Sequence, residues 1–201
     1  MPTLLVLLKY PTPSRVKTRL AASLGPQEAA DLYRKWIELV FARVQPLREH
    51  VRVIAYYSGA PLTDFSAWLP LADQWWSQPE GDLGVRLAAG FEKAHSANEP
   101  VVAIGTDCLD VDSELVREAF SRLANYDTVF GPTPDGGYYL VGTFKHLLGF
   151  FDGVRWSSLE TRSSHIALCE RNGWTVSVLP SRCDIDTIED WHRYCAKVAT
   201  G

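Results

Sequence analysis

The sequence predicts an α/β protein with a mostly parallel central sheet that is covered by helices on both faces. Segments typical of strands alternate with segments typical of helices along nearly all of the 201 residues. The strand-like segments are short and almost continuously apolar, as in residues 4–8 and 101–105, which is typical of strands buried on both faces. The helix-like segments repeat apolar residues at a spacing near 3.6, most clearly in residues 27–44.

The expected elements follow one another in a regular order. Strands are expected at residues 3–9, 51–57, 73–77, 101–105, 128–131, 138–141 and 174–179. Helices are expected at residues 27–44, 82–95, 112–123 and 159–172, and a last helix is expected to begin near Thr187. A polar loop with Pro11 and Pro13 joins the first strand to the first helix. No internal repeat and no linker rich in Pro, Gly or Ser divides the chain, so one domain over residues 1–201 is expected.

Local signals support the helix starts. Asp82 is a suitable N-cap for the second helix, and Asp112 or Ser113 is a suitable N-cap for the third. The last helix is preceded by a capping pattern in which Asp186 or Thr187 pairs with Glu189 or Asp190.

Composition excludes several classes of protein. The formal net charge is −4, so the basic face that nucleic acid requires is not expected. The apolar run at residues 4–8 is followed at once by Lys9 and Pro11 and is too short for a signal peptide or a membrane span. The four cysteines form no CxxC pair and match no zinc spacing, which favours free thiols in a reducing cytosol. We therefore expect a cytoplasmic protein, and the sequence carries no signal for its oligomeric state.

Ligands of mostly parallel sheets bind beyond the carboxyl ends of the strands. This rule selects the loop after Lys9, the loop after Gly105 and the segment before the last helix. The first loop carries Lys9, Arg15, Lys17 and Arg19 within eleven residues. These cations could clamp a diphosphate through charge-assisted hydrogen bonds, although a solvated basic loop is the alternative. The loop is not a P-loop, because no GxxxxGK[ST] motif is present.

Three aspartates in the other two places have the chemistry of metal ligands. Asp107 directly follows a buried strand, and Asp184 and Asp186 lie on one side of an extended segment. Carboxylates at a sheet edge suit Mg²⁺ or Mn²⁺ that is shared with phosphate oxygens. Asp107 could instead cap the turn that follows it. A capping role near Thr187 does not exclude a metal role for Asp184.

A glycine-containing loop between two predicted strands is a candidate sugar site. Gly136 and Gly137 allow positive φ angles and close approach of a ligand, and Asp135 could bind sugar hydroxyls or act as a base. An Asp-Gly pair between strands is also an ordinary hairpin signal. Tyr138 and Tyr139 point to opposite faces of a strand, so at least one of them is expected in the core.

Residues 78–86 form a further candidate loop. Gly81, Asp82 and Arg86 surround the start of a helix, where they could meet a ligand, although Gly81 could simply end a strand. The histidines show no HExxH motif or paired ligand spacing, and only His192, close to the acidic segment before the last helix, is kept as a candidate.

Five segments together carry a resemblance to one family. They are VKTRL (16–20), GDLGVR (81–86), IGTDC (104–108), GPTPDGGYYLVG (131–142) and DIDTIED (184–190). In this order they resemble the bacterial DUF2064 group of GT-A-type glycosyltransferases, in the nucleotide-diphospho-sugar transferase superfamily, some members of which are associated with arsenosugar biosynthesis. The resemblance implies a Rossmann-like GT-A fold, a nucleotide diphosphate ligand and a divalent metal. Two positions depart from the family pattern, because Ser14 replaces a usual glycine and Leu109 replaces a usual proline.

The expected function is metal-assisted transfer of a sugar from a nucleotide diphosphate sugar to an unknown small-molecule acceptor. Nucleotide and phosphate contacts are expected from Lys9, Lys17, Arg19, Gly81, Asp82, Arg86 and Asp107. The metal, Mg²⁺ or Mn²⁺, is expected on Asp107 with Asp184 or Asp186. Substrate contacts are expected from Asp135, Gly136, Gly137 and Tyr138, and Asp135 or Asp190 is expected as the catalytic residue that orients the acceptor or takes its proton. The motifs also resemble those of 2-phospholactate and molybdenum-cofactor guanylyltransferases, so nucleotidyl transfer is the first alternative and a non-catalytic nucleotide-sugar-binding module the second.

Overall fold

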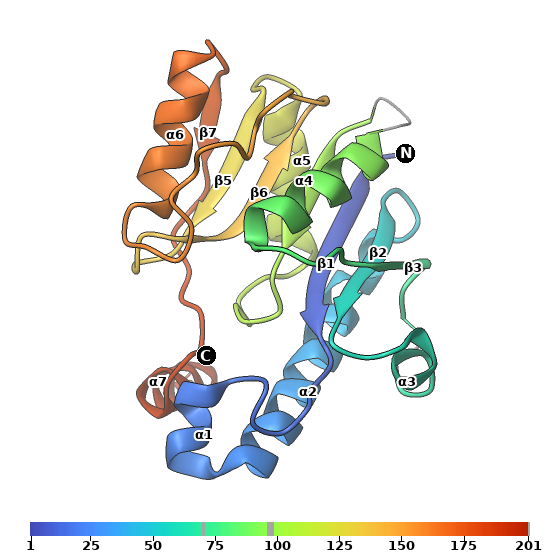
Figure 1. Ribbon diagram of the computed structural model, residues 1–201, viewed down its shortest axis with the longest axis vertical. Helices are drawn as coiled ribbons and strands as arrows, with labels where there is room; N and C mark the ends of the chain where they lie inside the picture. The colour runs from blue at the N-terminus through green and yellow to red at the C-terminus, as the bar shows by residue number, and fades with distance from the viewer. Residues whose placement is uncertain (70, 96–98, 201) are drawn as a thin grey trace.

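The computed structural model describes residues 1–69, 71–95 and 99–200 and is built around a seven-stranded mixed sheet (Figure 1). The strands are β1 (Thr3–Lys9), β2 (Arg52–Ser58), β3 (Gln74–Ser77), β4 (Val101–Ile104), β5 (Thr128–Pro132), β6 (Tyr138–Thr143) and β7 (Val176–Val178). Their order across the sheet is β3-β2-β1-β4-β6-β5-β7. The predicted α/β fold with a mostly parallel sheet is confirmed.

β6 is the strand that runs against its neighbours. β1 pairs in parallel with β2 and β4, β2 pairs in parallel with β3, and β5 pairs in parallel with β7. β6 is antiparallel to β4 and β5, because the short loop at residues 133–137 joins β5 to β6 as a hairpin. The first residues of β6, Tyr138 and Tyr139, therefore lie at the edge of the sheet where β1 and β4 end.

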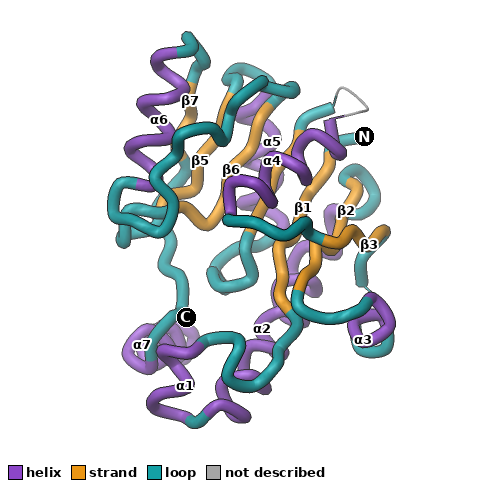
Figure 2. The backbone as a smooth tube through the Cα atoms, viewed as in Figure 1, coloured by secondary structure: helices purple, strands orange, loops and turns teal. Residues whose placement is uncertain are grey.

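Helices cover both faces of the sheet (Figure 2). They are α1 (Thr18–Leu24), α2 (Pro26–Val44), α3 (Leu62–Ser66), α4 (Leu83–Ala94), α5 (Ser113–Leu123), α6 (Thr161–Arg171) and α7 (Ile188–Thr200), with a 3₁₀ turn at Gln45–Leu47. Side chains alternate along β1, so Leu4, Val6 and Leu8 join the core formed with α2 and α5, whereas Leu5 joins the core formed with α4. The sheet thus separates two apolar cores.

Three helices begin at residues whose capping role the sequence predicts. The carboxylates of Asp82 and Asp112 each accept a hydrogen bond at 2.9 Å from the backbone N–H three residues further on. Before α7, the Thr187 hydroxyl accepts from the Asp190 backbone N–H at 3.3 Å, and the Asp190 carboxylate accepts from the Thr187 backbone N–H at 3.0 Å. This reciprocal pair is a capping box.

The segment expected to be a polar loop before the long helix contains a helix of its own. α1 begins at Thr18, inside the basic segment, and Leu20 is its one buried residue. So few buried positions give almost no helical spacing of apolar residues, which explains why the sequence pattern did not predict α1. Gly25, with a φ of 88°, ends α1 and directly precedes α2.

Two predictions from composition can be compared with the structure. The four cysteines are free thiols, with Cys108 and Cys169 buried and Cys183 and Cys195 exposed. Among the helices that the structure describes, none combines the length and the apolar composition needed to cross a membrane.

His165 on α6 is buried in an aromatic environment that disfavours its charged form. Its side chain is fully buried and packs against the rings of Phe130, Phe150 and Tyr138. Its Nδ1 lies 3.3 Å from the Tyr138 hydroxyl, whereas its Nε2 has no hydrogen-bond partner among the described residues. Burial lowers the pKa of His165 to about 4.

We expect the folded state to lose stability as the pH falls from about 6.5 towards 4, because the unfolded chain then binds a proton that folded His165 does not. The contribution of this residue is on the order of 2 kcal/mol between pH 7 and pH 5. Urea unfolding of the wild type and of His165→Gln at both pH values measures it. His95, whose pKa burial also lowers to about 4, affects both proteins alike. Equal losses of stability in the two proteins would contradict the prediction.

Candidate functional site

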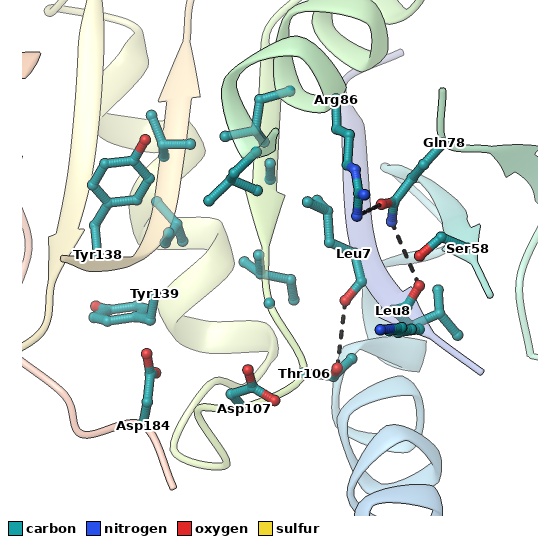
Figure 3. A pocket seen from close by; sticks show the side chains of 18 of the residues that line it. Leu7, Leu8, Ser58, Gln78, Arg86, Thr106, Asp107, Tyr138, Tyr139 and Asp184 are labelled. Atoms are coloured by element: carbon teal, nitrogen blue, oxygen red, sulfur yellow. Dashed lines mark hydrogen bonds between the residues drawn. The ribbon is translucent and has the colours of Figure 1, made fainter. Parts of the chain in front are cut away.

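A cavity of about 320 Å³ opens at the carboxyl edge of the sheet (Figure 3). Its wall combines the ends of β1, β2 and β4, the start of β6 and the first turns of α4. Apolar side chains such as Leu7, Leu87 and Val141 share this wall with polar side chains such as Gln78 and Asp107. The volume and the mixed wall suit a small organic ligand.

A second cavity of about 320 Å³ adjoins the first. Its wall carries the cations that the sequence singles out, namely Lys9, Arg15, Lys17 and Arg19. Lys9 and Asp107 belong to the walls of both cavities. The carboxylate that follows β4 therefore stands where a largely apolar cavity meets a basic one.

Lys17 joins two carboxylates from distant parts of the chain. Its Nζ lies 2.9 Å from Asp107 Oδ1 and 3.1 Å from Asp186 Oδ1, and it donates to the Ile185 carbonyl at 2.6 Å. The side chain of Lys17 is 6% exposed, whereas those of Asp107 and Asp186 are 45% and 48% exposed. Burial lowers the pKa of Lys17, but the two carboxylates outweigh burial and raise that pKa above its ordinary value. Lys17 is therefore a buried and charged ammonium.

Backbone conformation and aromatic rings hold Lys17 in this place. Lys17 precedes α1 with φ 45° and ψ 47°, a left-handed conformation that is uncommon for a residue with a side chain. Its Nζ stands 5.4 Å from the centre of the Trp36 ring and 5.9 Å from that of Tyr33. Both rings belong to α2, so the long helix forms the apolar side of the ammonium site.

Tyr33 also connects α2 to the ends of two strands, a role that its place in the sequence did not indicate. Its hydroxyl accepts from the Lys9 backbone N–H at 3.3 Å and lies 2.9 Å from the Thr106 hydroxyl. Thr106 in turn lies 3.4 Å from the Leu7 carbonyl. Tyr33 falls on the apolar stripe of α2, so the pattern indicated only a core residue. The one feature of the sequence that pointed to this network is Thr106, a polar residue beside Asp107 at the end of a buried strand.

Asp184 lies beside Asp107 in the wall of the first cavity (Figure 3). Burial and then the negative charge of Asp107 raise the pKa of Asp184 to about 7, and the nearby Lys17 only partly opposes them. A partly buried group of three aspartates with one ammonium carries excess negative charge. A bound cation would relieve this excess.

The turn before α4 is fixed by hydrogen bonds that involve the predicted residues. Asp82 caps the helix, and Arg86 Nε donates to the Gly81 carbonyl at 3.0 Å. Gly81 has a φ of 133°, which only glycine adopts readily. The Gln78 amide donates to the Tyr56 carbonyl at 2.6 Å, and Arg86 reaches the Gln78 amide oxygen at 3.5 Å. Arg86 and Gln78 both line the first cavity, and these hydrogen bonds hold their side chains in its wall.

The hairpin loop at residues 133–137 is stabilised by Asp135. Its Oδ1 accepts hydrogen bonds from the Thr133 hydroxyl and, at 3.1 Å, from the Gly137 backbone N–H. Gly136 has a φ of 87°, as expected for a glycine in this turn. Both tyrosines that follow line the first cavity, and Tyr139 is also buried in the core, as expected for at least one of the two.

Asp190 and His192 lie on α7 rather than in the walls of the two cavities. The Asp190 carboxylate accepts from the backbone N–H groups of Asp186 and Thr187 at 3.2 and 3.0 Å. Although burial raises the pKa of Asp190, these hydrogen bonds lower it below its ordinary value. Asp190 therefore orders the segment that carries Asp186, and His192 is exposed to solvent.

The sequence match covers more than half of the chain. Residues 40–158 match the family described as uncharacterized protein conserved in bacteria, DUF2064. The chain belongs to the DUF2064 family. No curated protein matches the chain.

Solved structures place this DUF2064 protein among nucleotide-diphospho-sugar transferase folds. It is similar to a protein of Desulfovibrio desulfuricans G20 that is provisionally described as a nucleotide-diphospho-sugar transferase, with 33% identity and a TM-score of 0.87 over 94% of this chain and 84% of that one. It also resembles 4-diphosphocytidyl-2C-methyl-D-erythritol synthase of Anaerococcus prevotii DSM 20548, with 12% identity and a TM-score of 0.63 over 99% and 98% of the two chains. Rv0371c of Mycobacterium tuberculosis H37Rv, solved in complex with manganese, has 16% identity and a TM-score of 0.56 over 96% of each chain. The last two likenesses show the fold alone.

The side chains of the DUF2064 site are compatible with a divalent metal when phosphate is also bound. Within the described residues, no group of three or more His, Cys, Asp or Glu side chains is arranged to hold a metal ion. The ammonium of Lys17 nevertheless bridges Asp107 and Asp186, and it contacts only the Oδ1 atom of each carboxylate. Mg²⁺ commonly binds one or two carboxylates together with water and substrate phosphates. The carboxylate pair fits this donor set.

Proposed function

We propose that this DUF2064 protein is a metal-assisted glycosyltransferase that uses a nucleotide diphosphate sugar, and that residues 1–201 form one catalytic domain. The observation that carries the proposal is the position of Asp107 in the walls of both cavities. One cavity offers apolar surface for a base and ribose, and the other offers cations for phosphates. A nucleotide diphosphate that spans the two would pass directly beside Asp107.

Each part of the donor then has a place in the proposal. The base and ribose occupy the first cavity, near Gln78 and Arg86, and the diphosphate extends towards Arg15 and Arg19. A Mg²⁺ or Mn²⁺ ion held by Asp107 and Asp186 would neutralise charge that develops on the departing diphosphate.

The hairpin loop supplies the acceptor side in this proposal. Thr133 and Gly137 both donate to Oδ1 of Asp135, and among the described residues Oδ2 has no partner. Oδ2 can therefore accept a hydrogen bond from an acceptor hydroxyl. Asp190 is not assigned a catalytic role, because its carboxylate is engaged by the backbone before α7.

The first loop favours glycosyl transfer over nucleotidyl transfer. A nucleotidyltransferase must bind a third phosphate, commonly with a Gly-rich first loop that presents several backbone N–H groups. Residues 10–19 contain no glycine, and Pro11 and Pro13 lack a backbone N–H. Side-chain cations such as Arg15 and Arg19 are the groups available in the second cavity instead.

We expect slow, Mn²⁺-stimulated hydrolysis of a nucleotide sugar to a nucleoside diphosphate when no acceptor is present. Labelled nucleotide sugars are incubated with the protein, and nucleoside triphosphates with sugar phosphates are incubated separately. Pyrophosphate release in the second incubation, without diphosphate in the first, would replace the proposal with nucleotidyl transfer. Nucleotide binding without turnover in either incubation would favour a non-catalytic binding module.

A further inference from the structure

Lys17 occupies the place between Asp107 and Asp186 that the proposed function gives to a divalent cation. An ammonium has three N–H donors, and three oxygens surround Nζ at 2.6, 2.9 and 3.1 Å. Two of these oxygens belong to the carboxylates of Asp107 and Asp186, and the third belongs to the backbone carbonyl of Ile185. The protein thus surrounds its own cation with oxygen ligands.

The ammonium is the one cation that these two carboxylates contact in the described part of the chain. Asp107 and Asp186 make no other side-chain hydrogen bond or ion pair there. Both are close to half exposed, so a cation from solution can reach them, whereas Lys17 is 6% exposed. Without Lys17, the two carboxylates would stand beside Asp184 with no compensating charge.

A divalent ion and the Lys17 ammonium carry like charge and would share the same carboxylates, so each disfavours the other. The lysine side chain has a flexible four-carbon stem, and its ammonium can move without a change in the backbone. Lys17 also belongs to the wall of the second cavity, together with Arg15 and Arg19. An ammonium that leaves the carboxylates therefore has a basic cavity of about 320 Å³ beside it.

We propose that Lys17 is an internal counter-ion that a divalent metal displaces, and that the displaced ammonium then binds phosphate oxygens in the second cavity. This inference rests on the proposed function, because it requires metal and phosphate at this edge of the sheet. If it holds, the metal and the phosphate each favour the binding of the other, and linkage requires that both affinities rise by the same factor.

The first test measures the affinity of the nucleotide-free protein for Mn²⁺ by titration calorimetry. Lys17→Met removes the competing ammonium, so Mn²⁺ should bind at least about tenfold more tightly than to the wild type. Lys35→Met removes the same charge from the exposed face of α2 and should stay within about threefold of the wild type. Circular dichroism establishes that each variant is folded.

The outcomes separate this inference from the function on which it rests. Mn²⁺ binding that is equal or weaker in Lys17→Met than in the wild type would overturn the counter-ion role and leave the metal site intact. The absence of Mn²⁺ binding to both proteins would overturn the metal site as well.

A second test needs only the wild type and applies if Lys17→Met does not fold. Buried Lys17 should react slowly with acetic anhydride, and saturating Mn²⁺ should raise its acetylation several-fold relative to exposed Lys35, measured by peptide mass spectrometry. Inorganic diphosphate added with Mn²⁺ should suppress the acetylation of Lys17 again. Acetylation of Lys17 that is unchanged or reduced by saturating Mn²⁺ would overturn the inference.

Discussion

Asp107→Asn is expected to weaken Mn²⁺-dependent binding of a nucleoside diphosphate by at least about 100-fold, while the protein keeps its fold. Asparagine has the shape of aspartate and retains an oxygen that can accept from Lys17 Nζ. The backbone carbonyl at this position still accepts from the Ile185 N–H at 3.0 Å. Only the negative charge is lost, and a neutral amide is a poor ligand for a hard divalent cation.

Calorimetric titrations of a nucleoside diphosphate with and without Mn²⁺ measure this effect. Asp110→Asn is the matched control, because it removes the same charge three residues away, where the Asp110 carboxylate pairs with Lys197 at 2.7 Å. The control should bind the metal and nucleotide as the wild type does. If Asp107→Asn also keeps the wild-type affinity in the presence of Mn²⁺, Asp107 serves only as a structural partner of Lys17.

Asp107→Asn and Lys17→Met alter the same ion pair, yet their expected effects on Mn²⁺ affinity have opposite signs. General damage to the local structure would weaken Mn²⁺ binding in both variants. If the metal binds the Asp107 carboxylate and competes with the Lys17 ammonium, Mn²⁺ binds more weakly to Asp107→Asn and more tightly to Lys17→Met. The pair of variants thus distinguishes a metal site with an internal counter-ion from a purely structural ion pair.

Local patterns were sufficient to predict most of the fold. Near-continuous apolar runs indicated β1 and β4, and the stripe of apolar residues indicated α2, because these features arise from neighbours in sequence. The capping box of Thr187 and Asp190 was predictable for the same reason, since its residues lie three positions apart. α1 escaped prediction because a short helix with one buried residue, Leu20, leaves no apolar spacing to detect.

The partners of the candidate site residues could not be predicted in the same way. The flanking cations predicted a phosphate role for Lys17, but its partner Asp186 lies 169 residues further along the chain. β4, β6 and β5 separate β1 from β7, and the segment before α7 reaches the loop after β1 by crossing the sheet edge past Tyr139 and Asp107. Asp135 differs, because the Thr133 hydroxyl that donates to it lies only two positions away, but the Asp-Gly pair between strands indicates a hairpin without specifying this hydrogen bond.

Gly136→Ala is expected to destabilise the protein by about 2–5 kcal/mol, the sum of a left-handed backbone penalty and a steric clash. Gly136 has a φ of 87°, and a Cβ atom there would lie well within 3.0 Å of the Leu159 carbonyl group. The clash is with backbone rather than with a flexible side chain, so the loop at residues 133–137 or the segment before α6 must move. The hydrogen bond from the Arg162 N–H to the Gly136 carbonyl, at 2.9 Å, holds the hairpin loop against the first turn of α6.

Gly153→Ala separates the two contributions, because Gly153 has a φ of 71° but no atom lies within 4 Å of the place that a Cβ would take. It should cost only the conformational penalty, about 1–2 kcal/mol. Urea unfolding at pH 7 compares both variants with the wild type, and the difference between them isolates the close approach of Gly136 to Leu159. Equal destabilisation in the two variants would mean that the hairpin loop moves away from Leu159 without a measurable free-energy cost. In that case the loop does not hold Asp135 in a fixed place against the segment before α6, and its assignment to the acceptor side would lose its structural basis.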